Sequence, residues 1–286
     1  VVVDACIIPD KHLATRVSEL LNNQGLRYDG KILALRLGAE KLSQHPEIKD
    51  MADLLEEGIE MVDYERPVQS IQKLTDLFTS AELFLKRDVK LLKGKYSREL
   101  EDHCTLIGKD LHVKKGAEII AATINTETGP VIIEKGALVM EGALLRGPLY
   151  IGDGAVIKMG AKIYGPTVIG PHAKVGGEIS NSIFLGYSNK GHDGYLGNSI
   201  VGEWCNLGAD TNTSNLKNNY GEVQRWSYDT MSMVPSGLQF CGLIMGDHSK
   251  CAINTQFNTG TTVGVFANIF TSKFPPKYIK SFSWLG

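Results

Sequence analysis

The chain has 286 residues, enough for two domains, and its net charge of −2 with scattered basic residues argues against a nucleic-acid or anionic-membrane surface. Its five cysteines form no Cys-x-x-Cys pair, so we expect reduced thiols and a cytoplasmic location instead of a disulfide framework or a zinc site. No apolar run reaches the ~18–20 residues of a membrane-spanning helix, and no signal peptide is seen. Because the chain begins Val1-Val2-Val3 without methionine, we expect a fragment.

Residues 1 to about 100 alternate between strand-like and helical patterns, which predicts a partial α/β region. It contains no glycine-rich phosphate loop and offers few strands for a sheet. A polar linker over 93–104 indicates a domain boundary, so we divide the chain into 1–100 and 101–286. Strand signals cover 1–8 and 31–37, with a turn at Asp29-Gly30, and helical patterns cover 11–22, 45–59 and 67–92.

The second region is dominated by an aliphatic residue at every sixth position. Neither a helix nor an ordinary strand has this period, whereas each face of a parallel β-helix needs one inward aliphatic residue per step. We therefore predict a parallel β-helix of hexapeptide repeats that begins near Leu106 and runs unbroken from Ile133 to Val175. The series comprises Ile133, Val139, Leu145, Ile151, Ile157, Ile163, Ile169 and Val175, with the same phase at Ile107, Val113, Ile119, Val201, Leu207, Met245, Cys251, Phe257, Val263 and Ile269.

The period is lost over 121–130, 176–199 and 214–244, and loops that leave a rigid solenoid are where chemistry is usually found. His192 lies in the second interruption between Gly191 and Gly194, and its ordinary pKa of ~6.5 suits a general base. The nearby asparagines can hold sugar hydroxyls, or they can form an asparagine ladder or a turn. The remaining histidines are expected to be surface or capping residues: His12, His45, His103, His112, His172 and His248.

These motifs resemble a known family. Lys190-Gly191-His192-x-x-Tyr195-Leu196-Gly197, followed by Asn206-x-Gly208-Ala209 and Asn215, is similar to the acetyltransferase half of the GlmU-like bifunctional N-acetylglucosamine-1-phosphate uridyltransferase/glucosamine-1-phosphate N-acetyltransferases. The resemblance covers about 105–272 and implies a left-handed β-helix that assembles as a homotrimer. The tail over 274–284 resembles a divergent branch from Bacteroidetes-like bacteria, in which a nucleotidyltransferase domain precedes the β-helix.

The resemblance also implies roles for individual residues. His192 would be the general base, Tyr195, Asn206 and Asn215 would hold the amino sugar, and Ala209, Ile253 and Thr271 would bind acetyl-CoA. No metal is implied for acetyl transfer, whereas the uridyltransfer step uses Mg²⁺ in the N-terminal domain. The family's phosphate-binding arginine and lysine are absent near Gly165 and at Ser180, so Lys158, Lys162 or Lys174 would have to substitute.

The sequence therefore favours an acetyl-CoA-dependent N-acetyltransferase that acts on an amino sugar phosphate resembling glucosamine-1-phosphate. It would form part of a bifunctional enzyme of nucleotide-sugar biosynthesis for the cell envelope. Three alternatives stay open. They are a sugar-1-phosphate nucleotidyltransferase whose β-helix is a trimer scaffold, a β-helix carbonic anhydrase with three histidines at a metal, and a non-catalytic trimeric module.

Overall fold

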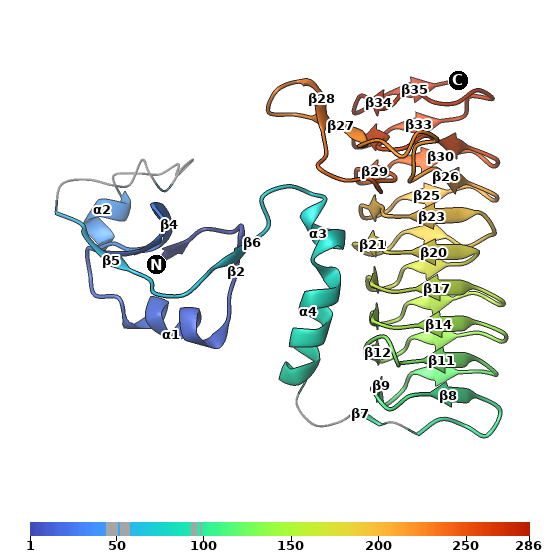
Figure 1. Cartoon of the computed structure of the whole chain (residues 1–286), viewed down its shortest axis with the longest axis horizontal. Coiled ribbons are helices and arrows are strands. Elements are labelled where there is room, and N and C mark those ends of the chain that lie inside the picture. Colours follow the sequence, from blue (N-terminus) through green and yellow to red (C-terminus); the bar gives the residue numbers. More distant parts are fainter. Residues whose placement is uncertain (44–50, 52–57, 93–95, 98) are drawn as a thin grey trace. The chain divides into compact units, whose positions relative to one another are not determined.

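The computed structural model describes residues 1–43, 51, 58–92, 96–97 and 99–286, which form two compact units, Val1–Leu74 and Thr75–Gly286. Figure 1 shows a small mixed α/β unit and a stack of coils. The predicted fold class, a parallel β-helix of hexapeptide repeats preceded by an α/β region, is confirmed. Within the described residues, no helix is both long and apolar enough to cross a membrane.

The first unit is built on a four-stranded sheet in the order β1 (Val2–Val3), β4 (Lys31–Arg36), β3 (Gln24–Tyr28) and β5 (Glu60–Asp63). A second pair joins β2 (Ile7–Ile8) to β6 (Gln69–Ser70). Helix α1 (Lys11–Glu19) is capped by Asp10, which accepts a hydrogen bond from the Leu13 amide at 2.7 Å, and α2 covers Ala39–Ser43. Leu13 packs with Leu26 and Leu33 in the core of this unit.

One of the predicted helices is divided into several shorter elements. The helix predicted over 67–92 is wrong as one element, because β6 occupies its start and is followed by α3 (Asp76–Thr79), α4 (Ala81–Asp88) and the 3-10 helix η2 (Val89–Leu91). The helix predicted over 45–59 falls largely on residues outside those described.

The β-helix has three faces, and nearly every coil of the stack in Figure 1 contributes one strand to each face. The first face consists of β9 (Leu111–Lys114), β12 (Val131–Ile133), β15 (Leu149–Ile151), β18 (Thr167–Ile169), β21 (Ile183–Phe184), β24 (Ile200–Val201), β29 (Ile244–Met245), β32 (Thr262–Val263) and β34 (Tyr278–Ile279), with β7 (Tyr96–Ser97) antiparallel to β9.

The second face consists of β10 (Glu118–Ile119), β13 (Leu138–Val139), β16 (Val156–Ile157), β19 (Lys174–Val175), β22 (Asn189–Lys190), β25 (Asn206–Leu207), β30 (Lys250–Cys251), β33 (Asn268–Ile269) and β35 (Trp284–Leu285). The third consists of β8 (Thr105–Ile107), β11 (Thr123–Asn125), β14 (Leu144–Arg146), β17 (Lys162–Tyr164), β20 (Glu178–Ser180) and β23 (Tyr195–Gly197), followed by the pair β26 (Asn212–Thr213) and β31 (Gln256–Phe257).

The repeated aliphatic residues fill the interior as predicted. Ile151, Ile157, Ile163 and Ile169 are each at most 1% exposed, and they belong to one continuous apolar core. Ile107 is an exception, because it is 39% exposed while its neighbour Leu106 pairs with the core residue Ile124. The predicted phase is wrong at Ile107 because the corner between β8 and β9 is one residue longer than the regular repeat.

Two of the three predicted interruptions are not loops. Strand β11 lies within 121–130, and β20 to β23 lie within 176–199, so the coils continue while altered corner lengths shift the period. The interruption over 214–244 is real, because the chain leaves the coil there to form the hairpin of β27 (Gln224–Ser227) and β28 (Ser232–Pro235).

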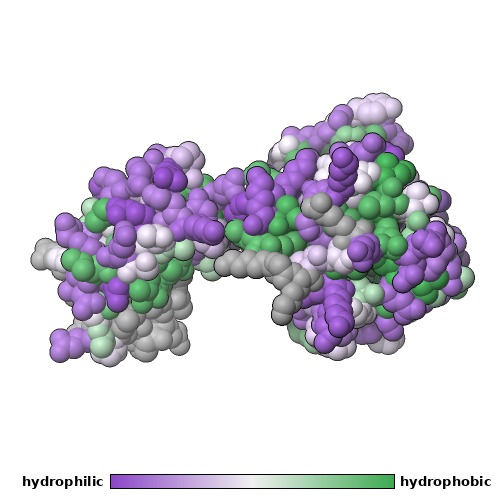
Figure 2. All heavy atoms as spheres, turned by 90° about the horizontal axis from the view of Figure 1, so that it is seen from below, coloured by the Kyte–Doolittle hydropathy of each residue, from purple (hydrophilic) through white to green (hydrophobic). Residues whose placement is uncertain are grey.

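Helices α3 and α4 belong to the second unit, because Phe78 and Ala81 are buried against Ile183 and Ile200 from the first face. The compact units therefore divide between Leu74 and Thr75, while the domain boundary near residue 100 stays a prediction. Hydrophilic and hydrophobic residues are interspersed over the face that Figure 2 presents, in keeping with the mixed composition.

A column of stacked rings follows the corner between the first and second faces. Neighbouring rings are 4.5–6.2 Å apart between centroids, as between Tyr187 and Trp204 at 4.7 Å. Each ring residue has a positive φ, for example +58° at Trp204, which costs a bulky residue free energy that glycine does not pay. We call this the aromatic column; it consists of His172, Tyr187, Trp204, His248, Phe266 and Phe282.

Candidate functional site

An open groove lies along the corner between the second and third faces, and a shortened turn creates it. Only Gly176 and Gly177 connect β19 to β20, whereas four residues connect β16 to β17 below and β22 to β23 above. The short corner recedes between two longer ones and leaves a groove of about 580 Å³. We call this the corner groove; it is lined by Met140, Lys158, Met159, Gly176, Gly177, Gly191, His192, Asp193, Ala209 and Asp210.

Glycine is required at the floor of this groove. A Cβ atom on Gly176 would lie 2.7 Å from the carbonyl oxygen of Gly191. Gly177 has a φ of +73°, and its Cβ would lie 2.6 Å from the carbonyl oxygen of Gly194. Any side chain here would push the two coils apart and fill the groove, so its depth depends on these glycines.

His192 is exposed and lines the groove from the upper corner. The turn over 191–194 that carries it joins two strands of a continuous coil, so the prediction that His192 lies in a loop leaving the solenoid is wrong. The turn is nevertheless held tightly. Gly194 accepts a hydrogen bond from the Glu178 amide at 3.1 Å, and the Tyr195 amide donates to Asn212 Oδ1 at 2.8 Å.

Lys190 was not predicted as a site residue beyond its place in the motif, yet it is buried beneath His192. It is only 1% exposed, and its Nζ donates to the carbonyl oxygens of His192 at 2.7 Å, Asp193 at 3.0 Å and Gly176 at 3.4 Å. Burial lowers the pKa of this ammonium to about 8, although Asp193 and Asp210 raise it in part.

Tyr195 and Asn215 meet on the third face, next to Asn198. The Asn215 Nδ2 group donates to the Tyr195 hydroxyl oxygen at 3.0 Å and to Asn198 Oδ1 at 2.8 Å. Burial raises the pKa of Tyr195, so its phenol stays protonated at neutral pH. Sequence reasoning missed Asn198, because it lies outside both the histidine motif and the asparagine cluster.

Asn206 is exposed on the second face, where β25 lies between Asn189 of β22 and Lys250 of β30. The candidate sugar ligands are therefore split between two faces of one chain. Tyr195 and Asn215 touch each other, whereas Asn206 lies on the other side of the corner that carries His192.

Ala209, Ile253 and Thr271, the residues assigned to acetyl-CoA by resemblance, follow one another on successive coils at the same corner as His192. The Asn254 amide donates to the Ala209 carbonyl oxygen at 2.8 Å, and the Ala252 amide donates to Ile269 at 2.8 Å, so the coils are in register there. Ile253 is 66% exposed. The row leads upward from the corner groove and offers a small side chain and backbone groups to a long, thin ligand.

Of the three lysines considered as phosphate ligands, Lys158 is the one that lines the corner groove with His192. Lys162 lies on the third face beside Arg146 in a separate groove, and Lys174 lies on the exposed side of β19.

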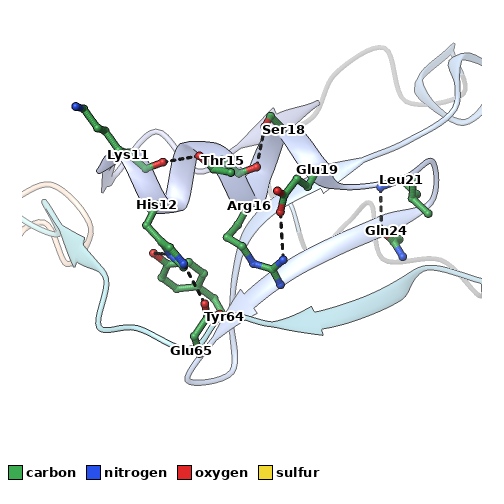
Figure 3. Close-up of polar contacts among 10 residues, drawn as sticks. All are labelled: Lys11, His12, Thr15, Arg16, Ser18, Glu19, Leu21, Gln24, Tyr64 and Glu65. Atoms are coloured by element: carbon green, nitrogen blue, oxygen red, sulfur yellow. Dashed lines mark hydrogen bonds and ion pairs between the residues drawn. The ribbon is translucent and has the colours of Figure 1, made fainter.

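Four other histidines have local partners, whereas His103 is exposed ahead of the first coil. In the first unit, His12 contacts the Tyr64 hydroxyl through Nδ1 at 3.0 Å and Glu65 through Nε2 at 3.2 Å, as drawn in Figure 3. His112 contacts Asp110 at 2.8 Å, and His172 and His248 belong to the aromatic column. Within the described part of the chain, no group of three or more His, Cys, Asp or Glu side chains is arranged to hold a metal ion.

A hexapeptide β-helix with a histidine-lined corner groove is consistent with the hexapeptide-repeat acyltransferases. Comparison with known proteins agrees with this class. Residues 1–96 match the family model described as sugar nucleotidyl transferase.

The curated relatives are bifunctional enzymes by name. The bifunctional sugar-1-phosphate nucleotidylyltransferase/acetyltransferase of Sulfurisphaera tokodaii is 33% identical over 144 residues, which are 50% of this chain and 35% of the relative. The bifunctional protein GlmU of Methanococcus maripaludis is 39% identical over 139 residues, which are 48% of this chain and 33% of the relative. That of Methanocaldococcus jannaschii is 34% identical over 87 residues, which are 30% of this chain and 21% of the relative.

The predicted resemblance to GlmU-like bifunctional proteins is thereby confirmed, while the assignment to a Bacteroidetes-type branch stays a prediction. The chain spans only 21–35% of the length of these relatives.

Proposed function

We propose that the β-helix unit is an acetyl-CoA-dependent N-acetyltransferase that acts on an amino sugar phosphate resembling glucosamine-1-phosphate. The N-terminal region would belong to the nucleotidyltransferase half of the same enzyme. The observation that carries the proposal is the corner groove, in which an exposed histidine lies at the foot of a row of small or backbone-exposing residues on successive coils. The names of the relatives support the same pair of activities.

In this mechanism His192 is the general base. The neutral amine of the acceptor attacks the thioester carbonyl carbon, and His192 accepts the amine proton as the C–N bond forms. The C–S bond then breaks, and coenzyme A leaves as its thiolate. General-base assistance of this kind contributes typically ~10²–10⁴ in rate, and positioning in a rigid groove contributes further.

The sugar would be held by Tyr195, Asn215 and Asn206, whose amide and hydroxyl groups both donate and accept hydrogen bonds. Because these residues lie on two faces of one β-helix, we propose that the acceptor site is completed between neighbouring copies in a homotrimer. Lys158 is our candidate for the phosphate, since it is the lysine that shares the corner groove with His192.

The long thin cofactor, acetyl-CoA, would follow Ala209, Ile253 and Thr271. The residues fit such a ligand, because the row is in register, partly exposed and free of bulky charged side chains. Its own contribution when bound is the activated acetyl group.

A second activity, sugar-1-phosphate nucleotidyl transfer with the β-helix as scaffold, is favoured by the family match over residues 1–96. Mg²⁺ would be the metal of that half in the full-length enzyme. In this reading the chain by itself would show no acetyl transfer.

The test is a mass-spectrometric assay of the purified chain with acetyl-CoA and a panel of amino sugar phosphates. Wild-type protein should acetylate one of them, and His192→Ala should lower kcat by ~10²–10⁴ with the fold intact. His103→Ala is the matched control, because His103 is also exposed but precedes the first coil. Full activity of His192→Ala would remove the histidine from the mechanism, and absence of acetylation by the wild type would leave the nucleotidyltransferase reading.

A further inference from the structure

Lys190 occupies a position that the fold reserves for apolar side chains. The inward residues of the second face form a vertical series in which only one member is charged. In the coils directly below and above, Val175 and Leu207 fill the same place. The series runs Ile119, Val139, Ile157, Val175, Lys190, Leu207, Cys251 and Ile269.

A lysine here is unfavourable for folding. Taking an ammonium group out of water costs several kcal/mol even after the surroundings relax, whereas a leucine or methionine of similar size would gain free energy from burial. The other coils have apolar residues at this inward position, so the fold does not require a charged group there. The ammonium must therefore be explained by what it contacts.

The hydrogen bonds of Lys190 Nζ go to backbone carbonyl groups around the groove. Lysine has three donors, and the Nζ of Lys190 reaches three carbonyl oxygens: His192, Asp193 and Gly176. The two shorter bonds, 2.7 and 3.0 Å, go to the candidate base and to the residue after it. The third joins this turn to the short corner that forms the groove floor.

Hydrogen bonds therefore hold the turn over 191–194 both from the core and from the neighbouring coil. From the inside, Lys190 draws the carbonyl groups of His192 and Asp193 toward the core, which directs the side chains at this corner outward. From the coil above, Asn212 Oδ1 accepts the Tyr195 amide. Gly194, with a φ of +108°, lets the chain pass beneath Thr211, whose carbonyl oxygen would lie 2.3 Å from any Cβ.

We infer that Lys190 is a positioning residue, which fixes the backbone of the His192 turn from inside the β-helix so that the imidazole faces the corner groove. The inference rests on the proposed function for its catalytic consequence, but the positioning itself is a property of the fold. Lys190 touches no substrate in this scheme and acts through the two carbonyl groups.

The test is Lys190→Met, which keeps the length and volume of the side chain and removes the three donors. Leu207→Met, in the coil above on the same face, is the matched control for a methionine in this series. We expect Lys190→Met to fold with a resistance to urea near that of the wild type, because removing a buried ammonium offsets the loss of its hydrogen bonds to three carbonyl oxygens. Its kcat should nevertheless fall at least ~10-fold with the KM for acetyl-CoA little changed, while Leu207→Met stays near wild type. If Lys190 only supported the fold, a variant with unchanged stability would not lose kcat.

A second readout does not depend on activity. Amide hydrogen exchange of the Tyr195 N–H should be faster in Lys190→Met by ~10-fold or more, and unchanged in Leu207→Met. Wild-type kcat in a folded Lys190→Met protein, or unaltered exchange, overturns the inference while the proposed function stands. If wild-type protein shows no acetyl transfer, the proposed function fails and the exchange measurement alone decides the role of Lys190. Should Lys190→Met not fold, Lys190→Leu removes the same donors and introduces the residue that fills this place in the coil above, and wild-type exchange at Tyr195 in that variant counts against positioning.

Discussion

Raising the pH through the alkaline range should stabilise the wild-type chain relative to its Lys190→Met variant. Burial lowers the pKa of Lys190 from 10.5 to about 8 in the folded state. Between these two values the unfolded chain binds more protons than the folded one, so the free energy of unfolding rises with pH. Below pH ~8 both states carry the proton, and the full cost of burying the charge is present.

The size of the effect follows from the pKa difference. A shift of about 2.5 units at about 1.4 kcal/mol per unit gives a relative stabilisation of roughly 3 kcal/mol between pH ~8 and ~10.5. This is a large part of the ~5–15 kcal/mol that holds a typical domain together.

The assay is urea unfolding followed by far-ultraviolet circular dichroism at several pH values from about 6 to about 10.5. The chain concentration should be held constant in case the protein assembles. Other titrating groups cancel in the difference between the wild type and Lys190→Met, and Leu207→Met should follow the wild type because it retains Lys190. A stability difference that stays constant across this range would refute the argument that a charged amine is buried in the coil.

Three further outcomes are expected. Ile157→Asp should unfold the β-helix because it buries an unpaired carboxylate at a cost of several kcal/mol. The control Val156→Asp, on the outward side of the same strand, should fold. Circular dichroism that shows a folded Ile157→Asp protein would contradict the core assignment. Asn215→Ala and Asn206→Ala should raise the KM for the amino sugar and leave that for acetyl-CoA nearly unchanged, and steady-state kinetics showing equal losses for both substrates would count against a sugar-binding role. In the aromatic column, Trp204→Gly should be more stable than Trp204→Ala by about 1 kcal/mol, since only glycine relieves the strain of a φ of +58°; thermal unfolding in the reverse order would show that the strain is absent.

Much of the β-helix could be predicted because inward burial repeats locally along the chain. The spacing of six residues between Ile151, Ile157 and Ile163 predicts one inward residue on each face of a coil, and all three side chains are buried in the structure. The prediction failed where a corner gained or lost residues, as at Ile107. A fixed spacing of six residues cannot predict a change in the length of a corner. For the same reason a loop was predicted over 176–199, where the structure has continuous coils.

The candidate site divides in the same way. The motif around His192 and the later residues Ile253 and Thr271 could be found by resemblance, because the identities of the side chains carry it. The corner groove could not, since it arises where the two-residue corner at Gly176 and Gly177 recedes beneath a longer one.

The sequence by itself determined that this chain winds into a β-helix and that a histidine stands among glycines near its middle. Only the tertiary structure decided that Lys190 points into the core beneath that histidine. The reason is physical: the direction of a side chain on a strand follows from local alternation, but which carbonyl groups surround a buried ammonium depends on how coils of unequal length stack.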